Sequence, residues 1–175
     1  MFEKIIAFFM SIIMAIFPFF GENKTVSNEE VAEAVIYAVE NKDASALEAV
    51  MCKNIKDNFD DLTGEINTML SLIEGDIESI TWKKFGGYYE SDGNGKSVKQ
   101  NAQSYTIITS KGVYGISVTI ETDNSFAPDE LGIRAIALNT QVKNPDPNTN
   151  TSYEYIYGEF LYRIFATEGI GTMHN

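Results

Sequence analysis

The hydrophobic positions that follow residue 26 first recur every three or four residues, the spacing of one face of an α-helix. Ser27-Asn28-Glu29-Glu30 begins this region with a capping box, in which the Ser27 hydroxyl and the Glu30 carboxylate bind free backbone N–H groups. Asp43 is placed to cap a second, short helix, and hydrophobic residues between Ile55 and Ile73 mark a third. The pattern therefore predicts three N-terminal helices.

From Asp76 onward the hydrophobic residues alternate with polar ones, as in β-strands that bury one face. Gly86-Gly87 predicts a bulge or bend in the first strand, and a glycine-rich hairpin loop follows that strand. Further strands are predicted over residues 97–109, 113–122 and 131–142. We therefore predict an α+β fold, in which the three helices pack on a curved antiparallel sheet of about four strands.

The run from Tyr153 to Ala166 fits two structures. Its hydrophobic residues match a helical stripe, but Tyr153, Tyr155 and Tyr157 also alternate, and Gly158 disfavours a helix. The sequence leaves the choice between helix and strand open for this segment.

Residues 5–20 form an apolar segment of sixteen residues without a charge. As a helix it would extend about 24 Å at about 1.5 Å per residue, less than the roughly 30 Å hydrocarbon core of a bilayer. It is interpreted as an uncleaved membrane anchor, a removed secretory signal, or a helix buried in a soluble fold or dimer. Export or membrane attachment is favoured, because a small soluble domain does not easily bury a helix that is apolar on every side.

This interpretation divides the chain into three parts. We expect an apolar leader over residues 1–20, a polar tether over 21–26 and one α+β domain over 27–175. The protein is then exported, and either anchored in a membrane through residues 5–20 or secreted.

The chain of 175 residues carries a formal net charge of -12, of which residues 21–80 contribute -10. A nucleic-acid site needs a basic surface, so nucleic acid is not expected as a partner. The acidity belongs to the predicted helices, where Asp60, Asp61 and Glu65 face either solvent or a basic protein partner.

Cys52 is the only cysteine of the chain and His174 the only histidine. One cysteine excludes an internal disulfide and a cysteine-based zinc site, and one histidine removes most histidine-dependent catalysis. Asp57, Asp61 and Glu65 share a helical face but lack the loop of a calcium site. No metal, cofactor or catalytic residue is therefore predicted.

The remaining candidate residues are aromatic or basic. Trp82, Tyr88, Tyr105 and Tyr114 fall in predicted strands, and Arg134, one of two arginines, falls inside another. A buried partner or an anionic ligand would explain an arginine at a strand position. Core or exposed sheet positions are the alternative explanation, but taken as a site the five residues predict a ligand pocket on the sheet.

Four short strings resemble an uncharacterised bacterial family of small exported or lipoprotein-like domains: Val31–Ala34, Asn41–Ala44, Ile73–Ser79 and Gly132–Ile136. The order of the predicted elements is also similar to the cone-shaped, nuclear-transport-factor-2-like fold, which is also called cystatin-like. The likeness covers about residues 28–140, and the lipidated cysteine of lipoprotein members is missing. It implies the cone-like fold but no activity, because that fold includes isomerases, dehydratases, binding modules and toxin-immunity proteins.

These observations favour a non-catalytic function: an exported or membrane-tethered domain that binds a small molecule or another protein. One alternative is a metal-independent acid–base enzyme of the isomerase or dehydratase kind, with a carboxylate beside a tyrosine in the pocket. The other is an immunity or inhibitor protein that docks through its acidic helices.

Overall fold

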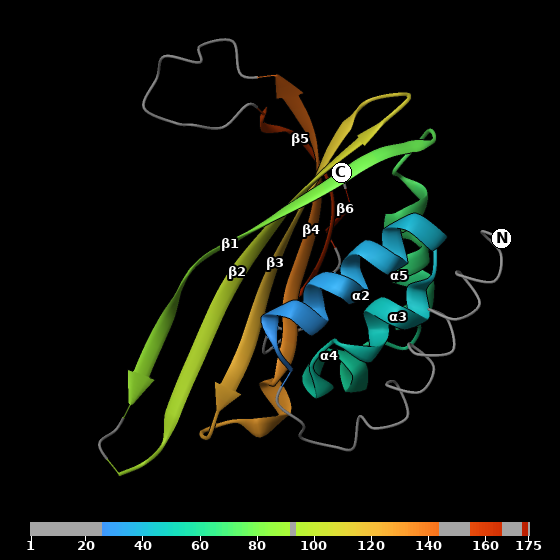
Figure 1. Ribbon diagram of the computed structural model, residues 1–175. Coiled ribbons are helices and arrows are strands. Elements are labelled where there is room, and N and C mark those ends of the chain that lie inside the picture. The colour runs from blue at the N-terminus through green and yellow to red at the C-terminus, as the bar shows by residue number, and fades with distance from the viewer. Residues whose placement is uncertain (1–25, 92–93, 144–154, 166–172, 175) are drawn as a thin grey trace, which may run out of the picture.

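The computed structural model describes residues 26–91, 94–143, 155–165 and 173–174. These residues form the helices α2 (Asn28–Asn41), α3 (Ala44–Ala49), α4 (Lys53–Asn58) and α5 (Leu62–Ser71), and a short 3-10 helix, η2 (Pro128–Glu130). The strands are β1 (Ile77–Ser91), β2 (Ser97–Thr109), β3 (Val113–Asn124), β4 (Gly132–Lys143), β5 (Tyr155–Phe165) and β6 (Met173–His174). All six strands belong to one antiparallel sheet in the order of the chain, with the α-helices against one of its faces (Figure 1).

The fold is α+β, but the prediction of three helices and about four strands is wrong. The stretch between Ile55 and Ile73 holds two helices, because the backbone is extended at Phe59 and Asp61 caps a new helix by accepting from Gly64 N at 2.9 Å. Hydrophobic spacing continues across this break and so does not reveal it. The cone-like, nuclear-transport-factor-2-like layout rested on the same three helices and four strands, and it is not retained.

The segment that the sequence left open supplies the fifth strand. β5 pairs with β4, with Ala135 opposite Phe165 and Leu138 opposite Tyr162. Tyr162 and Ile164 are buried, two positions apart, while Arg163 between them is exposed. Pairing with β4 therefore selects the alternating pattern over the helical one.

Two local predictions are confirmed. Ser27 accepts from Glu30 N at 3.1 Å while Ser27 N donates to the Glu30 carboxylate at 2.8 Å, which is the predicted capping box. The register between β1 and β2 shifts between Phe85 and Tyr88, at the predicted glycine pair. A Cβ on Gly87 would lie 1.6 Å from the backbone oxygen of Gln100, so the close approach of the two strands there requires glycine.

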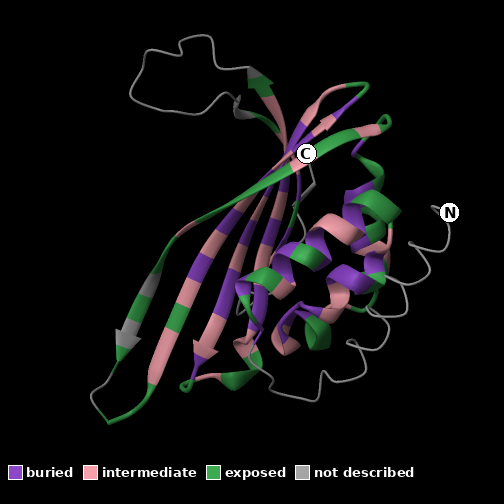
Figure 2. Cartoon of the chain, viewed as in Figure 1, coloured by how far each residue is buried: buried purple, intermediate pink, exposed green. Residues whose placement is uncertain are grey.

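The core lies between the helices and one face of the sheet. Buried and half-buried positions alternate along β2 (Figure 2), and Gln103, Tyr105 and Ile107 are among the buried ones. Gln103 Nε2 donates to the backbone oxygen of Asn28 at 2.7 Å, which identifies this face of β2 as the one under α2. The opposite face is the one that matters for the site below.

The predicted leader, residues 1–20, lies outside the described residues. Within the described part of the chain, no helix combines the length and the apolar character needed to cross a bilayer.

Candidate functional site

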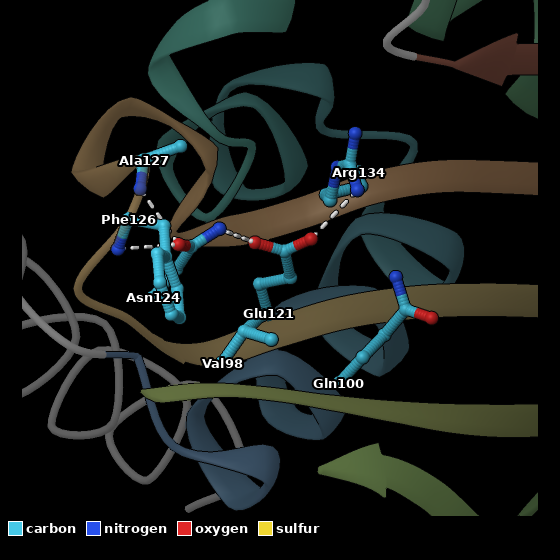
Figure 3. A pocket seen from close by; sticks show the side chains of 7 residues that line it. All are labelled: Val98, Gln100, Glu121, Asn124, Phe126, Ala127 and Arg134. Atoms are coloured by element: carbon cyan, nitrogen blue, oxygen red, sulfur yellow. Dashed lines mark hydrogen bonds and ion pairs between the residues drawn. The ribbon is translucent and has the colours of Figure 1, made fainter. Parts of the chain in front are cut away.

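An open pocket of about 480 Å³ lies where β2, β3 and β4 meet the segment that follows β3. Its lining combines apolar and polar side chains (Figure 3): Val98, Gln100, Glu121, Asn124, Phe126, Ala127 and Arg134. Asn101 and Gln103 are buried positions of β2 on the face that the helices cover, and Gln100 is the neighbour of Asn101. Successive side chains of a strand point to opposite faces, so β2 presents Val98 and Gln100 on the face away from α2.

A buried carboxylate and an arginine form the polar side of this pocket. Glu121 lies opposite Gly132 in the register of β3 and β4, and the register shift between Thr119 and Ile120 makes Arg134 the extra residue of a β-bulge. Arg134 Nη1 donates to Glu121 Oε1 at 2.6 Å. The bulge thus turns the guanidinium toward the acid instead of continuing the alternation of β4.

Asn124 holds the second oxygen of the Glu121 carboxylate. Its Nδ2 donates to Glu121 Oε2, while its Oδ1 accepts from the backbone N–H groups of Phe126 at 3.1 Å and Ala127 at 2.7 Å. One side chain therefore joins the buried acid to the turn that carries Phe126 over the pocket.

A second acid reaches the same guanidinium from η2. Glu130 Oε2 lies 2.8 Å from Arg134 Nε, an ion contact without the alignment of a hydrogen bond. Glu130 Oε1 accepts from Asn54 Nδ2 of α4 at 2.5 Å. The Glu121–Arg134–Glu130 triad thus connects two strands of the sheet with a helix.

Burial makes the charges of this triad interdependent. The Glu121 side chain is 3% exposed, so it has lost nearly all contact with water and depends on Arg134 and Asn124 for compensation. Burial lowers the pKa of Arg134, but the neighbouring Glu121 and Glu130 carboxylates outweigh burial and raise it above its ordinary value. Arg134 therefore stays charged, and the triad has one net negative charge.

Cys52 lies beside the triad, with its Sγ 4.0 Å from Glu130 Oε2. The residue is fully buried, and burial raises the pKa of its thiol from 9.0 to about 11. The protonated thiol is thus the stable form in the folded protein, which agrees with a packing role rather than a nucleophile.

We expect the Cys52 thiol of the folded protein to resist iodoacetamide at pH 8 and to react fully after unfolding.

The raised pKa means that the protonated Cys52 thiol stabilises the folded state. Its contribution to the free energy of unfolding is complete below pH 9, and about 2–3 kcal/mol is lost as the pH rises from 9 to 11. Urea unfolding at pH 8 and pH 11 measures this loss. Cys52→Ala is the control, since it retains the tyrosine and lysine titrations, and an equal loss in both proteins would contradict the assignment.

The five residues predicted as a pocket do not gather at one place. Arg134 lines the pocket described above, and its buried partner is Glu121. Tyr105 is buried under the helices, where it donates to Gln103 and stacks on Trp82 with ring centroids 6.5 Å apart. Tyr114 shares that face of the sheet, and its hydroxyl accepts from Glu74 N at 3.2 Å. Tyr88 lies opposite Gln100 in β1, and its side chain is outside what the structure describes.

The sequence pattern gave no prediction for Glu121, Asn124, Gln100 or Phe126 in the pocket. An arginine at a strand position indicated a buried partner or an anionic ligand, and several acids lay within reach along the chain. Only the register of β3 and β4, with the bulge at Arg134, selects Glu121.

The acidic residues of the predicted third helix are largely occupied by local contacts. Asp57 pairs with Lys53, Asp61 caps α5, and Glu65 accepts from the hydroxyl of the buried Tyr162. Burial and the Glu65 hydrogen bond raise the pKa of Tyr162. Among the described residues, no group of three or more acidic, cysteine or histidine side chains is arranged to hold a metal ion.

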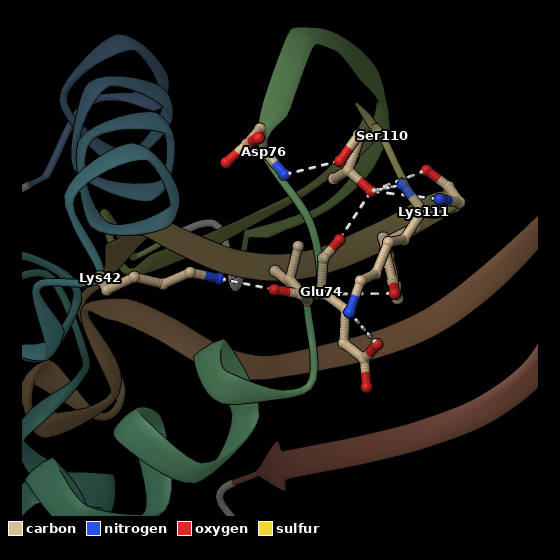
Figure 4. A network of polar contacts seen from close by, with 9 residues as sticks. Lys42, Glu74, Asp76, Ser110 and Lys111 are labelled. Atoms are coloured by element: carbon tan, nitrogen blue, oxygen red, sulfur yellow. Dashed lines mark hydrogen bonds and ion pairs between the residues drawn. The ribbon is translucent and has the colours of Figure 1, made fainter.

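A second polar network joins the helices to the turn between β2 and β3 (Figure 4). Lys42 has a left-handed backbone, with φ 53°, and its Nζ donates to the backbone oxygens of Leu70 at 2.7 Å and Ile73 at 2.9 Å. The Glu74 backbone oxygen accepts from Thr109 Oγ1 at 2.7 Å, and Asp76 N donates to Ser110 Oγ at 3.0 Å. Backbone groups form most of these bonds, so the network has a structural role at the end of α5.

A family model described as a domain of unknown function (DUF5104) matches residues 34–144, which is more than half of the chain. The matched residues include α3, α4, α5 and the strands β1 to β4, and therefore every residue that lines the pocket. Among curated proteins no match was found.

Proposed function

Because the chain belongs to the DUF5104 family, which has no assigned function, we propose a function from the pocket itself: a non-catalytic domain that binds a small ligand. The observation that carries this proposal is a pocket of about 480 Å³ that combines an apolar wall with polar groups. Ligand sites in proteins typically enclose about 300–1,000 Å³ and have this composition.

The charges around the pocket favour a neutral ligand with an oxygen acceptor. The contacts of Arg134 with Glu121 and Glu130 use Nη1 and Nε, so Nη2 is the donor that remains for a ligand. The net negative charge of the triad is offset by Lys96, whose Nζ lies 5.8 Å from the centroid of the Phe126 ring, so the pocket favours neither an anion nor a cation. Val98 and Phe126 provide apolar surface, with Phe126 48% exposed, and Gln100 adds an amide.

Three probes of one shape and different charge test this proposal: benzamide, benzoate and benzylamine. We expect benzamide to shift the amide NMR signals of Gln100, Phe126 and Arg134, with a millimolar Kd that is typical of so small a ligand. Benzoate and benzylamine should bind at least threefold more weakly. The titrations are followed by two-dimensional ¹H–¹⁵N spectra.

Two variants connect the binding to the pocket. Phe126→Ala, which removes the exposed ring, should weaken benzamide at least threefold, whereas Thr106→Ala, on β2 outside the pocket, should leave it unchanged. If none of the probes shifts these signals, or if both variants respond equally, the binding proposal is wrong.

We also propose that the domain is exported and is either secreted or tethered to a membrane through residues 5–20. The uncharged apolar run supports this, as does the likeness to exported bacterial domains. Fractionation of cells that express the native chain should place it in the membrane or outside the cytosol. Recovery only from the cytosol would contradict the proposal.

The acid–base alternative has one observation in its favour, the hydrogen bond from Tyr162 to Glu65. Tyr162 is only 1% exposed, so a substrate would not reach its hydroxyl. The hydrogen bond between Tyr162 and Glu65 therefore joins β5 to α5 and has a structural role. Ligand binding remains the function that we propose.

A further inference from the structure

The glycine-rich turn between β1 and β2 contains a pair of residues that is chemically labile. Asn94 is followed by Gly95, and this is the only Asn-Gly pair in the 175 residues. Asparagine is a thermally labile residue, because the backbone nitrogen of the following residue can attack its side-chain amide. Glycine hinders this attack least, since it has no Cβ and its backbone adopts most conformations. Whether the pair reacts then depends on the structure around it.

The structure leaves Asn94 and Gly95 room for this reaction. Both residues are exposed, and the strands β1 and β2 that flank them extend past the helices (Figure 1). Gly95 has φ 86°, and a Cβ built on it would meet no atom within 4 Å. The space at Gly95 is open, so the peptide group between the two residues can turn toward the Asn94 side chain without displacing a packed neighbour.

Asn124 shows how the fold protects another asparagine that precedes a small residue, Ser125. The Asn124 residue is 8% exposed, its Nδ2 donates to Glu121, and its Oδ1 accepts from two backbone N–H groups. The nitrogen that would attack it, Ser125 N, donates to the backbone oxygen of Ser97 at 2.8 Å. The side chain and the attacking group are both held in place, so Asn124 should be stable in the folded protein.

We infer that Asn94 is a site of spontaneous deamidation in the folded protein, with the backbone nitrogen of Gly95 as the nucleophile. Gly95 N loses its proton and forms a bond to Asn94 Cγ, the Cγ–Nδ2 bond breaks, and the amino group leaves with a proton as ammonia. Water then opens the succinimide ring at either carbonyl group and gives aspartate or isoaspartate. The reaction needs only water, and the inference does not depend on the ligand pocket.

The reaction changes both the charge and the backbone of the turn. Each product has a carboxylate in place of a neutral amide, so the formal net charge of -12 becomes one unit more negative. Isoaspartate also adds a methylene group to the main chain, inside the loop that the pairing of Ser91 with Ser97 closes. The new carboxylate is two residues from Lys96, whose Nζ lies 5.8 Å from the Phe126 ring centroid. The modified chain therefore differs in charge beside a residue that contacts the pocket.

Mass spectrometry of the folded full chain, kept in mild detergent at pH 8, tests the inference. Trypsin releases Asn94 in a peptide of residues 85–96 and Asn124 in a peptide of residues 112–134. We expect the first peptide to gain one mass unit with time, because a hydroxyl replaces an amino group, while the second keeps its mass. Incubation in H₂¹⁸O should add two further mass units to the first peptide, because the new oxygen comes from water.

Two variants connect the reaction to the named atoms. Gly95→Ala places a methyl group beside the attacking nitrogen and should slow the gain of mass about tenfold, which corresponds to about 1.4 kcal/mol in the barrier. Asn94→Gln retains an amide but would have to form a six-membered ring, so it should show no gain in the same time. Isomerisation of Asp92 before Gly93 changes no mass and therefore does not disturb the measurement.

Unfolding in guanidinium chloride separates the effect of the fold from that of the sequence. Asn94 should react in the unfolded chain at a rate close to that in the folded chain, whereas Asn124 should begin to react only there, because its hydrogen bonds are lost. If neither peptide of the folded chain changes its mass, or if both change at the same rate, the inference is wrong. An equal gain of mass in the Asn94→Gln variant would also overturn it.

Discussion

Replacing Arg134 by methionine is expected to lower the free energy of unfolding by about 3–5 kcal/mol, the usual cost of removing one partner from a buried ion pair. The Glu121 carboxylate is 3% exposed and would lose the guanidinium that lies 2.6 Å from it. Glu130 would lose its contact with Nε at the same time. Urea unfolding followed by circular dichroism measures the change, and a melting temperature lower by about 10 °C should accompany it.

Two variants show whether the unpaired, buried charge of Glu121 causes the loss of stability. Glu121→Gln combined with Arg134→Met should be more stable than Arg134→Met alone, because the buried negative charge is gone. Arg163→Met replaces the other arginine, which is exposed and lies 4.9 Å from the Phe165 ring centroid, and should cost less than about 1 kcal/mol. Equal losses for the two arginines would contradict a special role for the triad.

Replacing Gly132 by alanine is expected to lower the free energy of unfolding by about 3 kcal/mol or more. Gly132 has φ 112°, which side chains rarely adopt, and a Cβ there would lie 2.7 Å from the backbone oxygen of Val50. Directly beside it, Cys52 N donates to Ile133 O at 3.0 Å and Ile133 N donates to Val50 O at 2.9 Å. The added methyl group would strain the backbone and separate these bonds, which join the turn between α3 and α4 to the sheet.

Gly95→Ala is the matched control for this variant. Gly95 also has a positive φ, 86°, but a Cβ there meets no atom within 4 Å. It should therefore show only the cost of the backbone conformation, about 1 kcal/mol. Thermal unfolding compares the two, and a Gly132→Ala protein no less stable than Gly95→Ala would show that the close contact with Val50 is not important.

The candidate site was only partly predictable. An arginine inside a strand indicated a buried partner or an anionic ligand, and Arg134 does line the pocket. The aromatic residues Trp82 and Tyr105 meet on the helix-covered face instead, because strand alternation divides the candidate residues between the two faces of the sheet. The sequence supplies this alternation, but it does not say which face the helices cover.

Local patterns in the sequence determined the capping box at Ser27, the bulge at Gly86-Gly87 and the change from helical to strand spacing at Asp76. The capping box and the change of spacing depend on residues only a few positions apart, and the bulge coincides with a glycine pair that is visible in the sequence. Only the tertiary structure decided that Tyr155–Phe165 is a strand and that Glu121, thirteen residues before Arg134, is its partner. Both result from pairing with β4, whose register depends on the packing of the whole sheet and therefore cannot be determined from either segment alone.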